Sequence, residues 1–121
     1  MKASELRLGN YIIANGSIEK INYITPATLG YGEKEFAPIC TSDYKYFEPI
    51  PLTEEWLLKF GFKNDEFISY RWYAPNDISL VYDLDDNCVC ISDSWEFGKI
   101  KYVHELQNLY FALTKQELKL K

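Results

Sequence analysis

The order of apolar and polar positions predicts a β-hairpin near the start of the chain. Apolar runs at residues 11–14 and 18–24 flank Asn15-Gly16. Asn-Gly between such runs favours a hairpin, because a type I′ turn needs a positive φ at both central residues. The chain is therefore expected to enter a sheet close to its start.

The following segments are expected to complete a small sheet. One proline and two glycines at residues 25–32 predict a loop, and short apolar runs predict strands at residues 36–41 and 44–47. We expect residues 1–48 to form a small curved β-sheet, an SH3-like partial barrel.

A short helix is predicted to begin at Thr53. Prolines at alternate positions in residues 48–51 give a stiff extended link before it. Apolar side chains cover a broad arc of this helix. Gly61 fits the left-handed position of a Schellman cap, which would fold Phe62 back onto Leu57.

A second antiparallel β section is predicted after this helix. Apolar and polar positions alternate at residues 68–72 and 78–84, and residues 88–92 can return as a partner strand. The period of two indicates strands with one buried face.

A second helix is predicted at residues 101–113, followed by a helical turn at residues 114–118 that a capping-box pattern opens. Its core stripe comprises Val103, Leu106, Leu109, Tyr110 and Leu113. The chain is thus expected to be α+β and one compact domain over residues 1–121, with sections at residues 1–48 and 49–121.

The composition of the chain restricts which kinds of partner it can bind and where in the cell it is expected. The 121 residues carry 13 basic and 18 acidic side chains, a net charge of −5, which disfavours binding to duplex nucleic acid. The start lacks the apolar region of a signal peptide, and no apolar run approaches the ~20 residues that span a bilayer. We therefore expect a soluble cytoplasmic protein that does not bind membranes.

Two sequence patterns resemble metal-binding sites, but each is better explained by a structural element that binds no metal. A zinc site could in principle use four ligands, Cys40, Cys88, Cys90 and His104. However, Cys88 and Cys90 lie one residue apart in an apolar strand, and cysteines in such a strand are typically small buried side chains. We expect free thiols.

The second pattern begins at Asp83 and matches the first three ligands of a calcium loop. The match then fails, because Cys88 replaces the glycine and Ser94 the bidentate glutamate that such a loop requires. A solvated turn is favoured here. Neither metal nor cofactor is expected, and no nucleophile, phosphate loop or acidic pair is singled out as catalytic.

Three blocks of sequence together resemble a known group of proteins. They are LRLGNY at residues 6–11, EPIPLTEEWLLKFGF at residues 48–62 and KYVHELQNLYFALT at residues 101–114. With these blocks the chain resembles an uncharacterised family of small proteins from gut bacteria and their phages or prophages. The resemblance implies a mobile-element setting and an intracellular location, and it carries no activity or site residues.

Phe111 is the residue of the second helix that fits the core stripe least well. On a helical wheel it lies outside the stripe, on the side of His104, Gln107 and Asn108. Either a neighbouring loop or the turn at residues 114–118 covers it, or these four residues form a partner surface.

The absence of catalytic motifs, together with ten Tyr and three Trp, favours a non-catalytic protein–protein interaction module. The resemblance implies that this module is of phage or mobile-element origin. Its partner would be a host or phage protein. The alternative is a small-ligand-binding protein or enzyme with a pocket between the two β sections. Partner identity and oligomeric state remain open.

Overall fold

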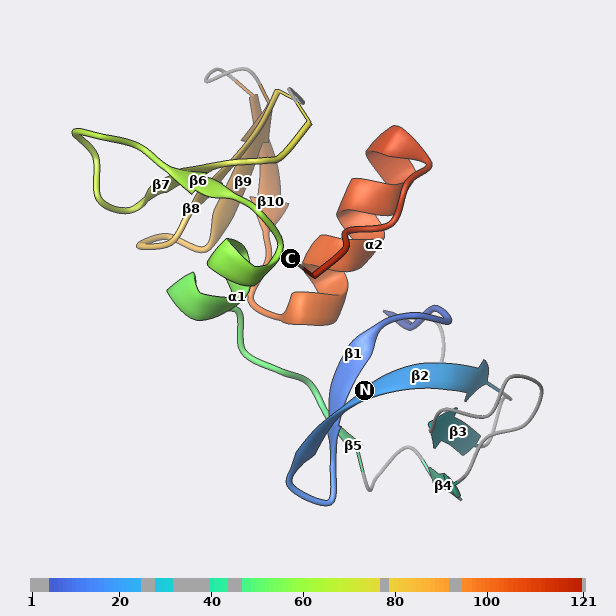
Figure 1. Cartoon of the computed structure of the whole chain (residues 1–121). Coiled ribbons are helices and arrows are strands. Elements are labelled where there is room, and N and C mark those ends of the chain that lie inside the picture. Colours follow the sequence, from blue (N-terminus) through green and yellow to red (C-terminus); the bar gives the residue numbers. More distant parts are fainter. Residues whose placement is uncertain are drawn as a thin grey trace. The chain divides into compact units, whose positions relative to one another are not determined.

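The chain divides into two units in the computed structural model, which describes residues 5–24, 28–31, 40–43, 47–76, 79–91 and 95–120. The first unit comprises Met1–Pro51 and Tyr102–Gln116, and the second comprises Leu52–Lys101 and Glu117–Lys121. The second helix therefore belongs with the first sheet, whereas its place in the sequence suggested the section at residues 49–121. Figure 1 shows the elements of both units.

The first unit contains a curled antiparallel sheet with the strand order β4-β3-β2-β1-β5. The strands are β1 (Tyr11–Ala14), β2 (Ser17–Ile24), β3 (Thr28–Tyr31), β4 (Cys40–Asp43) and β5 (Phe47–Glu48). This sheet confirms the predicted small curved β section.

The predicted hairpin is confirmed by the register of β1 and β2. Ala14 pairs with Ser17, and the two residues between them have the positive φ values of a type I′ turn, 51° at Asn15 and 80° at Gly16. Asparagine and glycine tolerate this left-handed region better than other residues do, so the local sequence sets the register.

The loop expected at residues 25–32 was wrong, because it contains β3. Leu29 and Gly30 pair with β2 on one side and with β4 on the other. Pairing on both sides outweighs the weak strand preference of a glycine-containing segment. Of the two strands expected next, residues 36–39 and 44–46 lie outside the described residues.

The second helix is α2 (Val103–Thr114), which packs against β1. The core of the first sheet includes Leu6, Ile12, Ala14, Ile21 and Phe47. Three positions of the predicted stripe on α2 are buried, but Leu113 is 40% exposed. The helical turn expected at residues 114–118 was also wrong, since Lys115 takes a left-handed φ of 63° and ends α2.

The second unit contains α1 (Glu54–Lys59) and an antiparallel sheet with the order β10-β9-β8-β7-β6. Its strands are β6 (Lys63–Asn64), β7 (Arg71–Tyr73), β8 (Leu80–Asp83), β9 (Cys88–Ile91) and β10 (Trp95–Lys99). Two antiparallel sheets and two helices confirm the α+β class. Neither helix in the described part of the chain is long and apolar enough to cross a membrane.

The strands of the second sheet depart from simple alternation. Leu80, Val81 and Tyr82 are all buried, although a strand with one wet face should expose the middle one. β7 begins only at Arg71, so residues 68–70 belong to the preceding loop rather than to the strand. β6 was missed because its two residues are both polar.

The C-terminus of α1 has the predicted Schellman geometry. The Phe62 N–H donates to the Leu57 carbonyl at 2.9 Å, and the Gly61 N–H donates to the Leu58 carbonyl at 3.0 Å. Gly61 has a φ of 85°. Thr53 occupies the N-cap position as expected, although its side chain makes no capping hydrogen bond.

We predict that Gly61→Ala lowers the free energy of unfolding by about 1–2 kcal/mol, the cost of a left-handed residue with a Cβ. Leu58→Ala, at a position that is 56% exposed in α1, is the control and should change it by less than about 0.5 kcal/mol. Urea denaturation measures both. Equal, small effects would contradict the importance of this cap.

Candidate functional site

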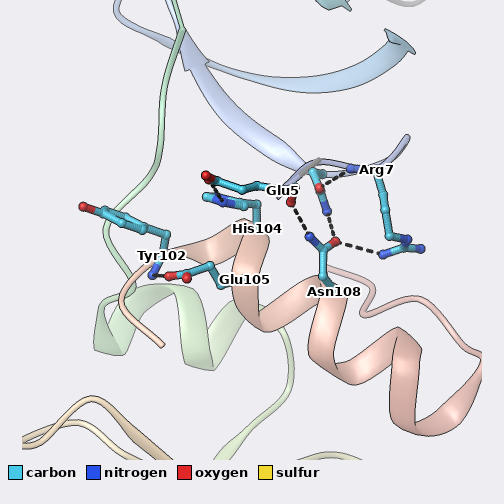
Figure 2. A network of polar contacts seen from close by, with 7 residues as sticks. Glu5, Arg7, Tyr102, His104, Glu105 and Asn108 are labelled. Carbon is cyan, nitrogen blue, oxygen red and sulfur yellow. Dashed lines mark hydrogen bonds and ion pairs between the residues drawn. The ribbon is translucent and has the colours of Figure 1, made fainter. Parts of the chain in front are cut away.

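His104 and Asn108, two of the four residues that the sequence singled out on α2, lie beside the N-terminal segment (Figure 2). His104 and Gln107 are each only 1% exposed, so they do not lie on an open surface. Asn108 and Phe111 are half-buried. The four residues therefore share one side of α2, as predicted, but that side faces residues 5–11 of the chain.

Gln107 supplies the hydrogen bonds that a longer β5 would have supplied. Its Oε1 accepts from the Tyr11 N–H at 2.9 Å, and its Nε2 donates to the Gly9 carbonyl at 3.1 Å. β5 reaches only Ile13 and Ala14 of β1. A side-chain amide has one acceptor and one donor group, as a backbone peptide has, so Gln107 continues the ladder past the end of β5.

Asn108 fastens the next residues of the same segment (Figure 2). Its Oδ1 accepts from Asn10 Nδ2 at 2.8 Å and from Arg7 Nη1 at 3.1 Å, while its own Nδ2 donates to the Glu5 carbonyl at 2.7 Å. Asn10 is fully buried, and its Oδ1 accepts from the Arg7 N–H at 2.7 Å. A buried amide needs such partners to offset its desolvation. We call Gln107, Asn108 and Asn10 the amide clamp.

Phe111 is covered by Arg7. The guanidinium carbon of Arg7 lies 4.0 Å from the centroid of the Phe111 ring, within the range of a cation–π contact worth about 0.5–2 kcal/mol. The sequence suggested a neighbouring loop or the turn at residues 114–118 as the cover, and the covering group comes from the N-terminal segment rather than from that turn. Whether the remaining exposed part of Phe111 touches a partner stays a prediction.

His104 is buried beside the carboxylate of Glu5, but the two groups are too far apart for a hydrogen bond. Its Nε2 lies 3.8 Å from Glu5 Oε2, and its ring stacks on Tyr102 with the centroids 5.9 Å apart. Neither ring nitrogen has a hydrogen-bond partner among the described residues. Burial lowers the pKa of His104, although the carboxylates of Glu105 and Glu5 act in the opposite direction. The imidazole is therefore neutral at pH 7.

A second candidate site, which the sequence did not predict, lies in the loop between β6 and β7. Phe67 in this loop is 92% exposed, the highest value among the exposed large apolar side chains of the described residues. Tyr70 and Tyr73 on its C-terminal side are each 36% exposed. The loop and the adjoining strand thus present three aromatic side chains to solvent.

Asp65 fixes the backbone of this loop. Its Oδ1 accepts from the N–H groups of Phe67 at 2.8 Å and Ile68 at 2.9 Å, and its Oδ2 accepts from the Tyr73 hydroxyl. The Asp65 N–H donates in turn to the Arg71 carbonyl at 2.9 Å. This is an Asx turn, in which a side chain takes the place of a backbone partner.

Asn64 fastens the far side of the same loop. Its Nδ2 donates to the carbonyls of Ser69 at 2.9 Å and Arg71 at 3.0 Å. The loop therefore has side-chain hydrogen bonds at both of its ends, and Phe67 projects from a backbone that its neighbours hold in place.

Asp65 is expected to be ionised, as a carboxylate that accepts hydrogen bonds from the loop should be. The hydrogen bond from Tyr73 lowers the pKa of Asp65, and the backbone N–H groups of Phe67 and Ile68 lower it further. The same hydrogen bond raises the pKa of Tyr73. At neutral pH the loop therefore contains an ionised carboxylate and a protonated phenol, which is the pairing that its hydrogen bonds need.

The candidate metal patterns form ordinary structure in the part of the chain that is described. Asp83 Oδ1 accepts from the N–H groups of Asp85 at 3.0 Å and Asp86 at 3.3 Å, as in a solvated Asx turn. Cys88 and Cys90 are half-buried thiols that form no disulfide, and Cys88 Sγ donates to the Asp86 carbonyl at 3.6 Å. Within the described ranges no three His, Cys, Asp or Glu side chains could hold a metal ion. The Cys40 side chain lies outside the description.

The chain matches no family model, and no curated protein or solved structure is significantly similar to it. Its function therefore has to be argued from its own side chains. Of the two candidate sites, the amide clamp uses its polar groups within the first unit, whereas the loop at residues 65–70 directs the ring of Phe67 to solvent.

We predict that Asn108→Ala lowers the free energy of unfolding by about 1–3 kcal/mol, because it leaves the buried Nδ2 of Asn10 without its partner. Urea denaturation measures the loss. Gln116→Ala, on an exposed residue after α2, is the control and should be nearly neutral. A neutral Asn108→Ala would mean that the clamp contributes no stability.

Acidification should destabilise the fold through His104. The unfolded state, with a His pKa near 6.5, binds a proton that the folded state resists, so stability is lost as the pH falls below about 6.5. Urea midpoints at about pH 7.5 and pH 5.5 should differ more for the wild type than for His104→Phe, which keeps a ring against Tyr102 and cannot titrate. An equal or smaller difference in the wild type would refute this sign.

Proposed function

We propose that the protein is a non-catalytic protein–protein interaction module of phage or mobile-element origin, acting in the cytoplasm on a host or phage protein. The observation that carries the proposal is Phe67, which is 92% exposed on a loop held by Asp65 and Asn64. The resemblance of three sequence blocks to phage and prophage proteins supports the setting.

Exposure alone would be unremarkable, since soluble proteins expose single apolar side chains routinely. The fixed backbone distinguishes Phe67 from such residues. Fully burying a phenylalanine contributes about 1.5–3 kcal/mol, and a partner that does so here has little loop entropy to overcome. Aromatic side chains on a preorganised backbone are typical of binding hot spots.

The neighbouring tyrosines extend the same surface. Tyr70 and Tyr73 add partly exposed rings with polar ends, a combination that is enriched at protein interfaces. The Tyr73 hydroxyl already donates to Asp65, so its ring is held in one position before any partner arrives. An interface centred on Phe67 would thus have one aromatic neighbour, Tyr73, that a hydrogen bond already holds.

Site-specific photo-cross-linking in cells tests the proposal. A photoreactive phenylalanine analogue at position 67 should cross-link to one protein that mass spectrometry can identify, because the side chain contacts the partner directly. The same analogue at Leu8, which is 59% exposed in the first unit, is the matched control and should not cross-link to that protein.

Phe67→Ser should abolish capture of the cross-linked protein and change the free energy of unfolding by less than about 0.5 kcal/mol, as at other exposed sites. Equal cross-linking at positions 8 and 67, or none at 67, would contradict the proposal. A large loss of stability in Phe67→Ser would instead assign the side chain to the fold.

A further inference from the structure

The loop that carries Phe67 lies beside an acidic turn at one end of the second sheet (Figure 1). β7 and β8 are antiparallel, and Arg71 at the start of β7 pairs with Asp83 at the end of β8. The β6–β7 loop and the β8–β9 turn are therefore neighbours. A hydrogen bond of 2.8 Å from the Leu84 N–H to the Tyr70 carbonyl joins them.

This end of the sheet is rich in carboxylates. Asp65, Glu66, Asp83, Asp85 and Asp86 all lie in the loop, in the turn or at the adjoining end of β8. Asp65 and Asp83 use their oxygens to cap backbone N–H groups. Glu66, Asp85 and Asp86 are exposed, and they place negative charge on the aromatic loop and on the turn beside it.

The basic residues at the same end are fewer. Arg71 lies opposite Asp83, and Lys99 lies opposite Cys88 at the start of β9. The sequence of the second unit has 11 acidic and 7 basic residues, a net charge of −4 out of the −5 of the whole chain. A partner of this end therefore meets a negative surface.

We propose that the loop at residues 65–70 and the turn at residues 83–87, together called the acidic aromatic end, bind a protein surface that offers an apolar pocket for Phe67 within a rim of Lys and Arg side chains. This inference rests on the proposed function and adds the chemistry of the partner. Complementary charge supplies specificity and speeds association, while the buried ring supplies most of the affinity.

A second copy of the chain is the poorer occupant of this surface. Two acidic aromatic ends facing each other would bring at least three exposed carboxylates of each copy together, and like charges across an interface oppose association. The aspartates also disfavour nucleic acid, whose phosphates carry the same sign. A protein surface with an apolar pocket and basic side chains around it would complement both the ring of Phe67 and the carboxylates.

Selection from a random-peptide display library tests this chemistry before any natural partner is identified. The full chain is the target, and Phe67→Ser is used for counter-selection. We expect the enriched peptides to combine large apolar residues with Lys or Arg, and to lose about tenfold or more in affinity for Phe67→Ser, the loss typical of a hot spot.

The charge is tested with a matched pair of double variants. Asp85→Asn with Asp86→Asn removes two charges from the acidic aromatic end, and Glu19→Gln with Glu48→Gln removes two from the first unit. The first pair should weaken the selected peptides several-fold and the second should leave them unchanged. Raising the salt from roughly 50 to 500 mM should weaken binding to the wild type.

Several outcomes would overturn the inference. They are the absence of any Phe67-dependent peptide, enrichment of acidic peptides, equal effects of the two double variants, and self-association of the chain that Phe67→Ser abolishes. A protein that cross-links at position 67 and binds Asp85→Asn with Asp86→Asn as tightly as the wild type would overturn the inference and leave the proposed function intact.

Discussion

The hydrogen bonds between α2 and the N-terminal segment are the constraint on which the first unit depends. Gln107 and Asn108 bind backbone and side-chain groups that lie about a hundred residues earlier in the chain. β5 pairs with only two residues of β1, and Gln107 provides hydrogen-bond partners for the Tyr11 N–H and the Gly9 carbonyl beyond them. Such partners matter because unpaired buried backbone groups are costly. The amide clamp thus joins α2 to the sheet and orders residues 5–11 together.

The clamp explains the burial of Gln107, one of two polar residues of α2 that are buried. A helix of this length would normally bury only its apolar stripe, yet His104 and Gln107 are as inaccessible as Leu106. Gln107 has backbone hydrogen-bond partners that offset its burial. His104 stacks on Tyr102 and lies 3.8 Å from the Glu5 carboxylate, but its ring nitrogens have no hydrogen-bond partner among the described residues. The burial of His104 is consequently poorly compensated, and the free energy of unfolding is expected to depend on pH through this residue.

Local sequence was sufficient for the elements that are specified within a few residues. Asn15-Gly16 predicted its hairpin and Gly61 its Schellman cap, because a positive φ restricts the choice of residue strongly. It failed at β3 and β6, where pairing with neighbouring strands overrides weak propensity. The wheel of α2 placed Phe111 correctly outside the stripe, but the covering Arg7 comes from a distant segment that no local pattern could reveal.

The loop around Phe67 was the site that sequence reasoning missed. Alternation at residues 68–72 suggested a longer strand, so the turn signal of Asn64-Asp65, two residues before that stretch, was overlooked. In both units polar side chains fix irregular backbone, but the clamp does so around buried groups and Asp65 does so beneath an exposed ring. Preorganisation of the backbone that carries this ring is the central claim of this account.

Backbone ¹⁵N relaxation of the free protein tests that claim most directly. If Asp65 and Asn64 hold the loop, the amide of Phe67 should have an order parameter near that of the strands, about 0.85. Asp65→Ala should lower it selectively in residues 66–69. An order parameter below about 0.6 for Phe67 in the wild type would show a flexible loop and contradict the account.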